Sequence, residues 1–194
     1  MAEEQPTARL SGATYAVSNT GPLISAFQSD SFALLAQIFA EIHISTACAA
    51  ELTRHGWEEE VQAASPKLTI VKLTSGEEKR AQTVAKLIAE HPDTNDPIVE
   101  NHLGEAQAIV LALRSEHQDD LLLLDEFAAR VIAKQMGIKL SGFPGALLLA
   151  VQGGLISAEE LKVRLEKCRE QGTHYGATFI QQVYEVAKQG RRKK

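Results

Sequence analysis

Aromatic residues are scarce in this sequence, and the chain has no excess of positive charge. Phe, Trp and Tyr make up 5% of the 194 residues, too few to predict a platform of rings on which single-stranded bases stack. The formal net charge is −5, which excludes a basic shell that would hold nucleic acid by itself. A local basic patch, or an acidic site that binds phosphate through cations, is still compatible with this charge.

Cysteines and long apolar runs are also lacking. The two cysteines, Cys48 and Cys168, form no C-x-x-C pair, so we expect a reducing cytosol rather than a disulfide framework. The longest apolar runs, such as GALLLAVQGGLI, are too short and too rich in glycine to span a membrane. The first residues, MAEEQPTARLSG, lack the apolar middle of a signal peptide. These absences predict a soluble, cytoplasmic protein with no membrane partner.

Apolar residues, at 44% of the chain, are sufficient for a core, and their pattern predicts strands that alternate with helices. The predicted strands are residues 15–18, EIHIS, KLTIVKL, DDLLLLDE and IKLSG. The helical patterns between them are PLISAFQSDSFALLAQIFA (interrupted near 29–30), TACAAELTRHGWEEEVQAA, GEEKRAQTVAKLIAEH, EAQAIVLALRSE and FAARVIAKQMG. This alternation indicates an α/β fold with a parallel sheet flanked by helices.

The chain divides into three predicted parts. Residues 1–13 are a flexible leader, residues 14–157 an α/β domain, and residues 158–190 a helical extension packed on the same domain. Within the domain, a polar insert at 91–103 is rich in Pro, Asp and Asn and predicts a loop.

Two helix starts are marked by capping residues. Thr46 fits the cap of the second helical pattern. Ser75 and Glu78 have the spacing of a capping box at the start of the third.

Polar and acidic residues recur where the predicted strands end. Asn19 follows the first strand, and Asp125 and Glu126 follow the run LLLL directly. Glu105 opens a predicted helix, and Glu51 lies inside the helix after the second strand. Because the carboxyl ends of parallel strands share one edge of a sheet, we expect these side chains to converge there. Clustered carboxylates repel one another, and Mg²⁺, which prefers oxygen ligands, is the usual remedy.

Each of these residues also has an ordinary structural explanation. Asp125 fits the cap of the helix that begins at Glu126. Glu126 and Arg130 have the i, i+4 spacing of an exposed ion pair, worth roughly 0.2–0.5 kcal/mol. Asn19 is a preferred residue type in turns, and Glu105 at a helix start is favoured by the helix dipole. Taken singly, the acids do not establish a site.

The joint pattern is more specific than its parts. In chain order, AVSNTGPLISAF, ISTACAAEL, GEAQAIVLAL and LLLLDEFAARVIAKQMGIKLSGFPGALLLAVQGGLI reach from about residue 15 to residue 157. This ordered set resembles the PIN-domain family of metal-dependent ribonucleases, which includes the VapC-type toxins, and in particular a branch described as nucleic-acid-binding proteins. The resemblance implies a three-layer α/β/α fold with a central parallel sheet and a Mg²⁺ or Mn²⁺ site built from acidic residues.

Carried over by position, the resemblance also implies roles for individual residues. The positions that carry catalysis are those of Asn19, Glu51, Glu105 and Asp125. The metal ligands among them are Asn19, Glu105 and Asp125. The positions that flank the site and could hold water, phosphate or the cofactor are Ser18, Thr20 and Glu126.

The same resemblance implies an activity and partners. Family members hydrolyse RNA phosphodiester bonds with metal-activated water, commonly as toxins that a small antitoxin protein neutralises. The C-terminal helices of this chain could extend the core, pair two subunits as a homodimer, or receive the antitoxin.

The sequence departs from the family pattern in three places. Asn19 stands where Asp is usual in the family, so the site has one negative charge fewer to attract a cation. A charge pair about 4 Å apart is worth roughly 4 kcal/mol at an effective dielectric constant of about 20, before desolvation. The insert at 91–103 is long for the family, either a lid over the active edge or a surface loop. Phe143 replaces a small hydroxyl residue. Two hypotheses follow: a nuclease with a weak metal site, or a catalytically impaired regulator that binds nucleic acid or protein.

Overall fold

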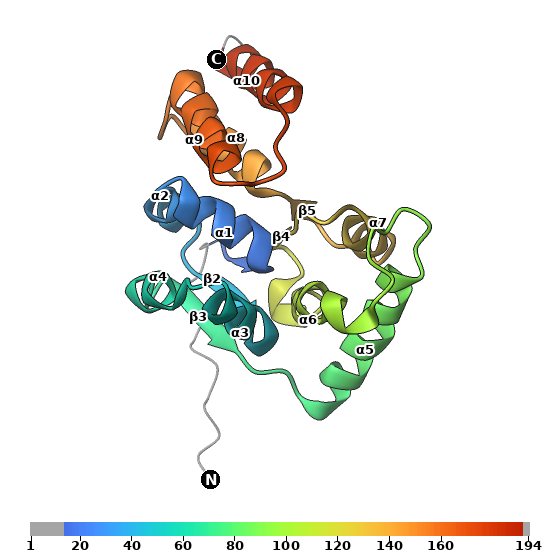
Figure 1. Ribbon diagram of the computed structural model, residues 1–194. Helices are drawn as coiled ribbons and strands as arrows, with labels where there is room; N and C mark the ends of the chain where they lie inside the picture. Colours follow the sequence, from blue (N-terminus) through green and yellow to red (C-terminus); the bar gives the residue numbers. More distant parts are fainter. Residues whose placement is uncertain (1–13, 192–194) are drawn as a thin grey trace.

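The computed structural model describes residues 14–191, which fold around one five-stranded sheet with all pairings parallel (Figure 1). The strand order is β3-β2-β1-β4-β5. This arrangement confirms the predicted α/β fold with a central parallel sheet and flanking helices. The predicted leader at 1–13 lies outside the described residues. The strands are β1 Ala16–Ser18, β2 Ile42–Ser45, β3 Leu68–Val71, β4 Leu121–Leu123 and β5 Leu140–Ser141.

Helices pack around the sheet, and the last helices of the chain lie together at one end of the molecule (Figure 1). The α-helices are α1 Thr20–Gln28, α2 Phe32–Ile38, α3 Thr46–Arg54, α4 Glu58–Ala63, α5 Ser75–Ala89, α6 Leu103–Ala112, α7 Phe127–Gln135, α8 Phe143–Gln152, α9 Ala158–Glu170 and α10 Ala177–Arg191. Two short 3-10 helices are η1 Val99–His102 and η2 Ser115–His117.

The strand order changes direction beside β1, which pairs with β2 on one side and with β4 on the other. Ser18 is opposite Leu123 in the parallel register. The segments that follow these two residues therefore leave the sheet side by side. Such a switch point, outside the carboxyl ends of the strands, is where open α/β sheets commonly bind ligands.

Both faces of the central strands are buried, as expected for a parallel sheet covered by helices. Ala16 and Val17, successive residues of β1 that point to opposite faces of the sheet, have no exposed surface. Helix α6 packs against β1, β2 and β4 and also against α5. Since α6 is covered on both sides, its sequence LGEAQAIVLA is mostly apolar, and Glu105 and Gln107 are the polar exceptions.

The predicted helix over 46–64 is two helices. Gly56 adopts φ +82° after α3, a conformation that glycine reaches without steric cost and that ends the helix. Ser45, rather than Thr46, caps α3, because its side chain accepts a hydrogen bond from the Cys48 backbone N–H.

The capping box of α5 also lies one residue earlier than the sequence predicts. It joins Thr74 and Glu77 rather than Ser75 and Glu78. Both pairs have the required spacing, and the observed one places Glu77 against Arg114, whose Nε donates to Glu77 Oε1 at 2.8 Å.

The insert at 91–103 is an ordered connection that contains η1. The Asp96 side chain accepts a hydrogen bond from the Ile98 backbone N–H at 2.9 Å. His102 is buried, with its Nε2 2.7 Å from the Asp96 backbone oxygen. The segment packs against α5 and leads directly into α6. Its contacts therefore fix where α6 begins.

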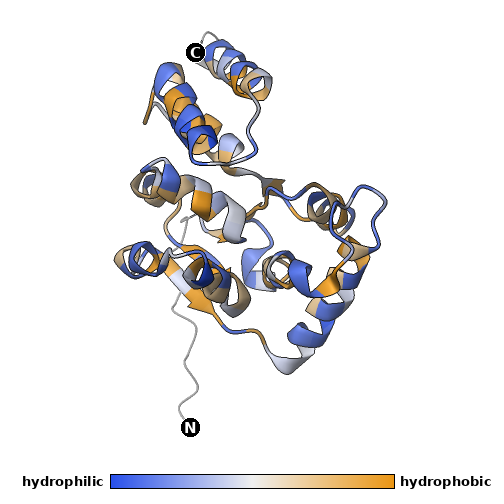
Figure 2. Cartoon of the chain, in the orientation of Figure 1, coloured by the Kyte–Doolittle hydropathy of each residue, from blue (hydrophilic) through white to orange (hydrophobic). Residues whose placement is uncertain are grey.

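The last three helices gather at one end of the molecule (Figure 1). Helix α9 begins with a capping box of Ser157 and Glu160, and its Leu161 and Leu165 are fully buried. Helix α10 packs against both α8 and α9. Figure 2 shows hydrophilic and hydrophobic residues together along α9 and α10, as expected for helices that pack on one side. Among the described residues, none of the helices is long and apolar enough to cross a membrane.

Candidate active site

Asn19 occupies the turn between β1 and α1 and is the N-cap residue of α1. Its backbone N–H donates to the Leu123 carbonyl oxygen at 3.1 Å, which ties the ends of β1 and β4 together. The residue is only 4% exposed. Its side-chain Nδ2 donates to Glu105 Oε1 at 3.3 Å. Its carbonyl oxygen Oδ1 is buried and has no hydrogen-bond partner within residues 14–191.

Asp125, just past β4, is held by donors on both carboxylate oxygens. Oδ1 accepts from the backbone N–H of Phe143, the first residue of α8, at 3.2 Å. Oδ2 accepts from the Tyr175 hydroxyl, also at 3.2 Å. Burial raises the pKa of Asp125, and these two bonds together with the charge of Arg130 oppose that rise.

Two glycines lie against these side chains, and one of them, Gly142, gives Asp125 room that a larger residue would occupy. A methyl group on the Gly21 Cα would lie 3.9 Å from Asp125 Oδ2 and 4.0 Å from Asn19 Oδ1, so both oxygens lie over this glycine. A methyl group on Gly142 would lie 2.2 Å from Asp125 Oδ1. Gly142 therefore allows the Asp125 carboxylate to reach the N-terminus of α8, a position favoured by the helix dipole.

Glu105 and Glu51 approach the same edge from α6 and α3. Burial and the negative charge of Glu51 raise the pKa of Glu105 to about 6. Glu51 Oε2 accepts a hydrogen bond from Thr20 Oγ1 at 2.6 Å. A methyl group on Gly104, the residue before Glu105, would lie 3.0 Å from Glu51 Oε2, so this glycine lets the two helices approach closely.

The chain matches a known protein family. A family model described as PIN domain (DUF3368) matches residues 15–189, which is most of the chain and includes the C-terminal helices. The chain belongs to the PIN domain family. A search of curated proteins finds no match. PIN domains are typically nucleases and generally bind Mg²⁺ or Mn²⁺.

The structure brings the four predicted catalytic residues of this PIN domain to one edge. Asn19 contacts Glu105 directly, and Asn19 and Asp125 both approach Gly21. Glu51 accepts a hydrogen bond from Thr20, the residue after Asn19, and its negative charge helps to raise the pKa of Glu105.

The flanking residues have identifiable local roles. Ser18 is fully buried, and its hydroxyl donates to the Asn19 backbone oxygen at 2.9 Å. Glu126, not Asp125, is the N-cap of α7, and its carboxylate accepts from the backbone N–H groups of Ala128 and Ala129. Its charge contributes to the raised pKa of Glu105. Arg130, considered above as its ion-pair partner, donates to the Leu124 backbone oxygen at 2.6 Å.

The oxygen atoms at this edge match the ligands that a divalent cation prefers. Mg²⁺ and Mn²⁺ take hard oxygen ligands, and every candidate donor here is a carboxylate or amide oxygen. No three His, Cys, Asp or Glu side chains within the described part of the chain are grouped closely enough to hold a metal. Asn19 is not one of these four residue types, and its buried, unpartnered Oδ1 lies near Gly21, as Asp125 Oδ2 does. The residues therefore fit a cation held by few protein ligands, with water completing its shell, as is usual for Mg²⁺.

Tyr175 is a site residue that the sequence reasoning missed. It belongs to the turn between α9 and α10 and is separated from Asp125 by 50 positions in the sequence. Burial and the negative charge of Asp125 raise the pKa of its phenol, which keeps the hydroxyl protonated as a donor. Only the packing of the C-terminal helices places it here, so no local pattern could have identified it.

We expect Gly142→Ala to disturb the site through steric conflict alone. The backbone of Gly142, with φ −118° and ψ −179°, suits any residue, but the added methyl group would lie 2.2 Å from Asp125 Oδ1. The conflict should lower the free energy of unfolding by about 1–3 kcal/mol, measured by urea denaturation. Gly76→Ala is the matched control, because nothing lies within 4 Å of its added methyl group; it should be neutral or slightly stabilising. Equal effects of the two substitutions would contradict the close approach of Asp125.

We expect Glu105→Gln to stabilise the metal-free protein above pH 6. The pKa of Glu105 is about 6 in the folded chain against 4.5 when unperturbed, so the folded chain binds its proton more tightly. Stability therefore falls as the pH rises from about 4.5 to about 6 and is lower by a constant amount above that. The amide should remove this loss, a gain of about 1–2 kcal/mol at pH 7.5. Urea denaturation across this pH range measures it, with exposed Glu100→Gln as the control. A difference in free energy of unfolding between wild type and Glu105→Gln that does not change with pH would contradict the expectation.

Proposed function

We propose that this PIN domain is a metal-dependent ribonuclease that hydrolyses RNA phosphodiester bonds. Mg²⁺ or Mn²⁺ is its cofactor. The single observation that carries the proposal is the carbonyl oxygen of Asn19, which is buried and has no hydrogen-bond partner within the described residues, on the side of Gly21 where Asp125 Oδ2 also lies. A buried acceptor next to a carboxylate is an arrangement that a cation relieves, since each oxygen gains a positive partner.

Each residue of the site has a distinct role in this proposal. Asn19 Oδ1 and Asp125 Oδ2 would hold the cation, whose chemistry is to activate water and to neutralise charge on the phosphate. Glu105, with a pKa of about 6, is suited to accept a proton from the attacking water near neutral pH. Asn19 Nδ2 orients Glu105 by donating to its Oε1. Glu51 is held in place by Thr20 and supplies the negative charge that helps set the proton affinity of Glu105.

The family also supports a biological setting. We propose that the enzyme acts in the cytoplasm as the toxin of a toxin–antitoxin pair and that a small antitoxin protein restrains it. Family membership is the only support for this part, and growth arrest on expression, relieved by a neighbouring small gene product, would test it.

A specific contact favours a second candidate function. The Asn19 amide already bridges to Glu105 Oε1, a position in which a cation would otherwise neutralise the carboxylate. If that bond substitutes for the metal, the chain is a catalytically impaired PIN-fold regulator that binds nucleic acid or protein.

RNA cleavage in the presence of Mn²⁺ distinguishes the two. We expect the wild type to cut a mixed single-stranded RNA and Asp125→Ala to lose about 100-fold or more of that activity, since a cation ligand contributes at least as much as a residue that supports one. Asn19→Asp should reach half-maximal rate at lower Mn²⁺, because it restores a negative charge.

Asp119→Ala is the matched control for Asp125→Ala. Asp119 lies just before β4 with its side chain 89% exposed, whereas Asp125 lies just after the same strand. Its replacement should leave cleavage unchanged. Cleavage by Asn19→Asp alone, with an inactive wild type, would favour the regulator.

A further inference from the structure

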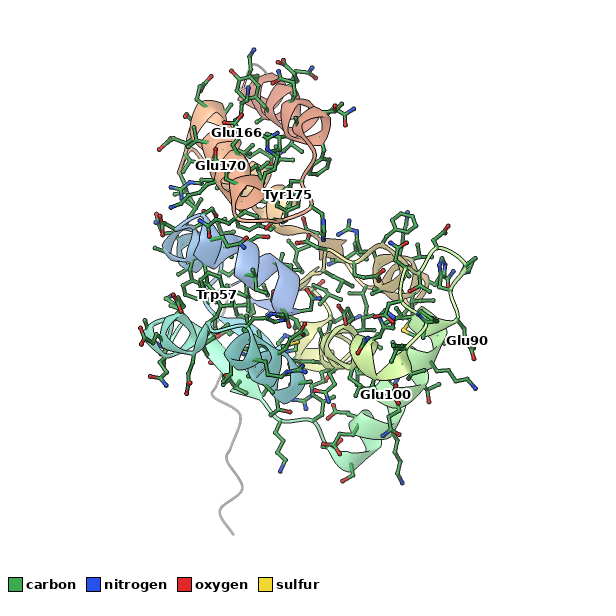
Figure 3. The ribbon with its side chains drawn as sticks, in the orientation of Figure 1. Trp57, Glu90, Glu100, Glu166, Glu170 and Tyr175 are labelled. Atoms are coloured by element: carbon green, nitrogen blue, oxygen red, sulfur yellow. The ribbon has the colours of Figure 1, made fainter. Side chains whose placement is uncertain are left out.

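The turn between α9 and α10 places one residue, Tyr175, against the site of Asn19 and Asp125. Tyr175 lies where the turn between α9 and α10 meets the rest of the molecule (Figure 3). Its hydroxyl is 3.1 Å from Ser25 Oγ of α1 and donates to Asp125 Oδ2 at 3.2 Å. Its ring stacks against Phe179 of α10, with centroids 5.9 Å apart and planes at 28°. The ring and the hydroxyl are thus fixed from opposite ends.

The turn that carries Tyr175 is bound tightly to the end of α1. Gln28 Nε2 donates to the Gln171 carbonyl oxygen at 3.3 Å, and Gln171 Nε2 donates back to the Gln28 carbonyl oxygen at 2.9 Å. Thr173 Oγ1 donates to Gln28 Oε1 at 2.6 Å. These reciprocal bonds determine where the turn lies, and Tyr175 follows two residues later.

The Tyr175 hydroxyl completes the fixing of the Asp125 carboxylate. The Phe143 N–H holds Oδ1 and the tyrosine holds Oδ2, which is also the oxygen that faces Gly21. A carboxylate oxygen can accept more than one partner, so Oδ2 retains capacity for a cation. Side chains that hydrogen-bond to a metal ligand orient it and commonly contribute 10–100-fold to metal affinity.

We infer that Tyr175 is a positioning residue that orients Asp125 for the divalent cation, and that the α9–α10 turn is therefore part of the metal site. This inference rests on the proposed function. The opposite possibility is that the hydroxyl competes with the cation for Oδ2. The two differ in sign, because loss of the hydroxyl weakens cation binding in the first case and strengthens it in the second.

The test is a calorimetric titration of the full chain with MnCl₂. Tyr175→Phe keeps the ring and its stacking on Phe179 and removes only the hydroxyl. We expect its Kd for Mn²⁺ to rise about 10-fold or more, with a metal-free melting temperature close to that of wild type. The Mn²⁺ concentration that gives half-maximal RNA cleavage should rise in parallel.

Tyr184→Phe is the matched control. Tyr184 lies on α10 and donates its hydroxyl to Glu159 Oε1 at 3.1 Å, so its replacement also removes a tyrosine–carboxylate bond, but away from the site. Its Kd for Mn²⁺ should equal that of wild type. Ser25→Ala removes the second partner of the Tyr175 hydroxyl and should weaken Mn²⁺ binding by a smaller factor.

The outcomes separate this inference from the proposed function. Tight Mn²⁺ binding by wild type with the same or lower Kd in Tyr175→Phe overturns the inference and leaves the nuclease proposal intact. Absence of Mn²⁺ binding by wild type overturns both. A raised Kd in Tyr175→Phe, with Tyr184→Phe unchanged, supports both.

Discussion

A buried amide oxygen without a hydrogen-bond partner typically costs a folded protein about 1–3 kcal/mol, and Asn19 Oδ1 carries that cost at the switch point of the sheet. The rest of the site is arranged around it. The Asn19 N–H joins β1 to β4, its side-chain Nδ2 donates to Glu105, and its carbonyl oxygen and the Asp125 carboxylate both lie near Gly21. A cation at this point would remove the cost, and this is the reason for the proposal that the unpartnered acceptor is a cation ligand.

An Asn at position 19, where the resemblance implies an Asp, alters the balance of charge at this edge. With an amide at position 19, the metal-free site has one negative charge fewer, and Glu105 gains a donor instead of a repelling neighbour. Burial and Glu51 still raise the pKa of Glu105 to about 6. The metal-free protein is therefore less strained than one with four carboxylates, at the expense of cation affinity.

Much of this organisation could be predicted from the sequence. The strands, the parallel sheet and the shared edge of Asn19, Glu105 and Asp125 follow from apolar periodicity and from where the acids stand. Local ambiguity caused the small errors, since Thr74 and Ser75 both fit a capping box and the sequence alone does not show that Gly56 ends α3. Tyr175 could not be predicted, because its place depends on how α9 and α10 pack. The role of Gly142 could not be predicted either, since it depends on Asp125, which is distant in sequence.

The most direct test of the central claim is the position of the cation in a crystal of the wild-type protein grown with Mn²⁺. We expect one anomalous scattering peak at about 2.0–2.2 Å from both Asn19 Oδ1 and Asp125 Oδ2, with water in the remaining positions. No peak at saturating Mn²⁺, with the Asn19 amide still bonded to Glu105, would contradict the claim and identify the fold as a binding module.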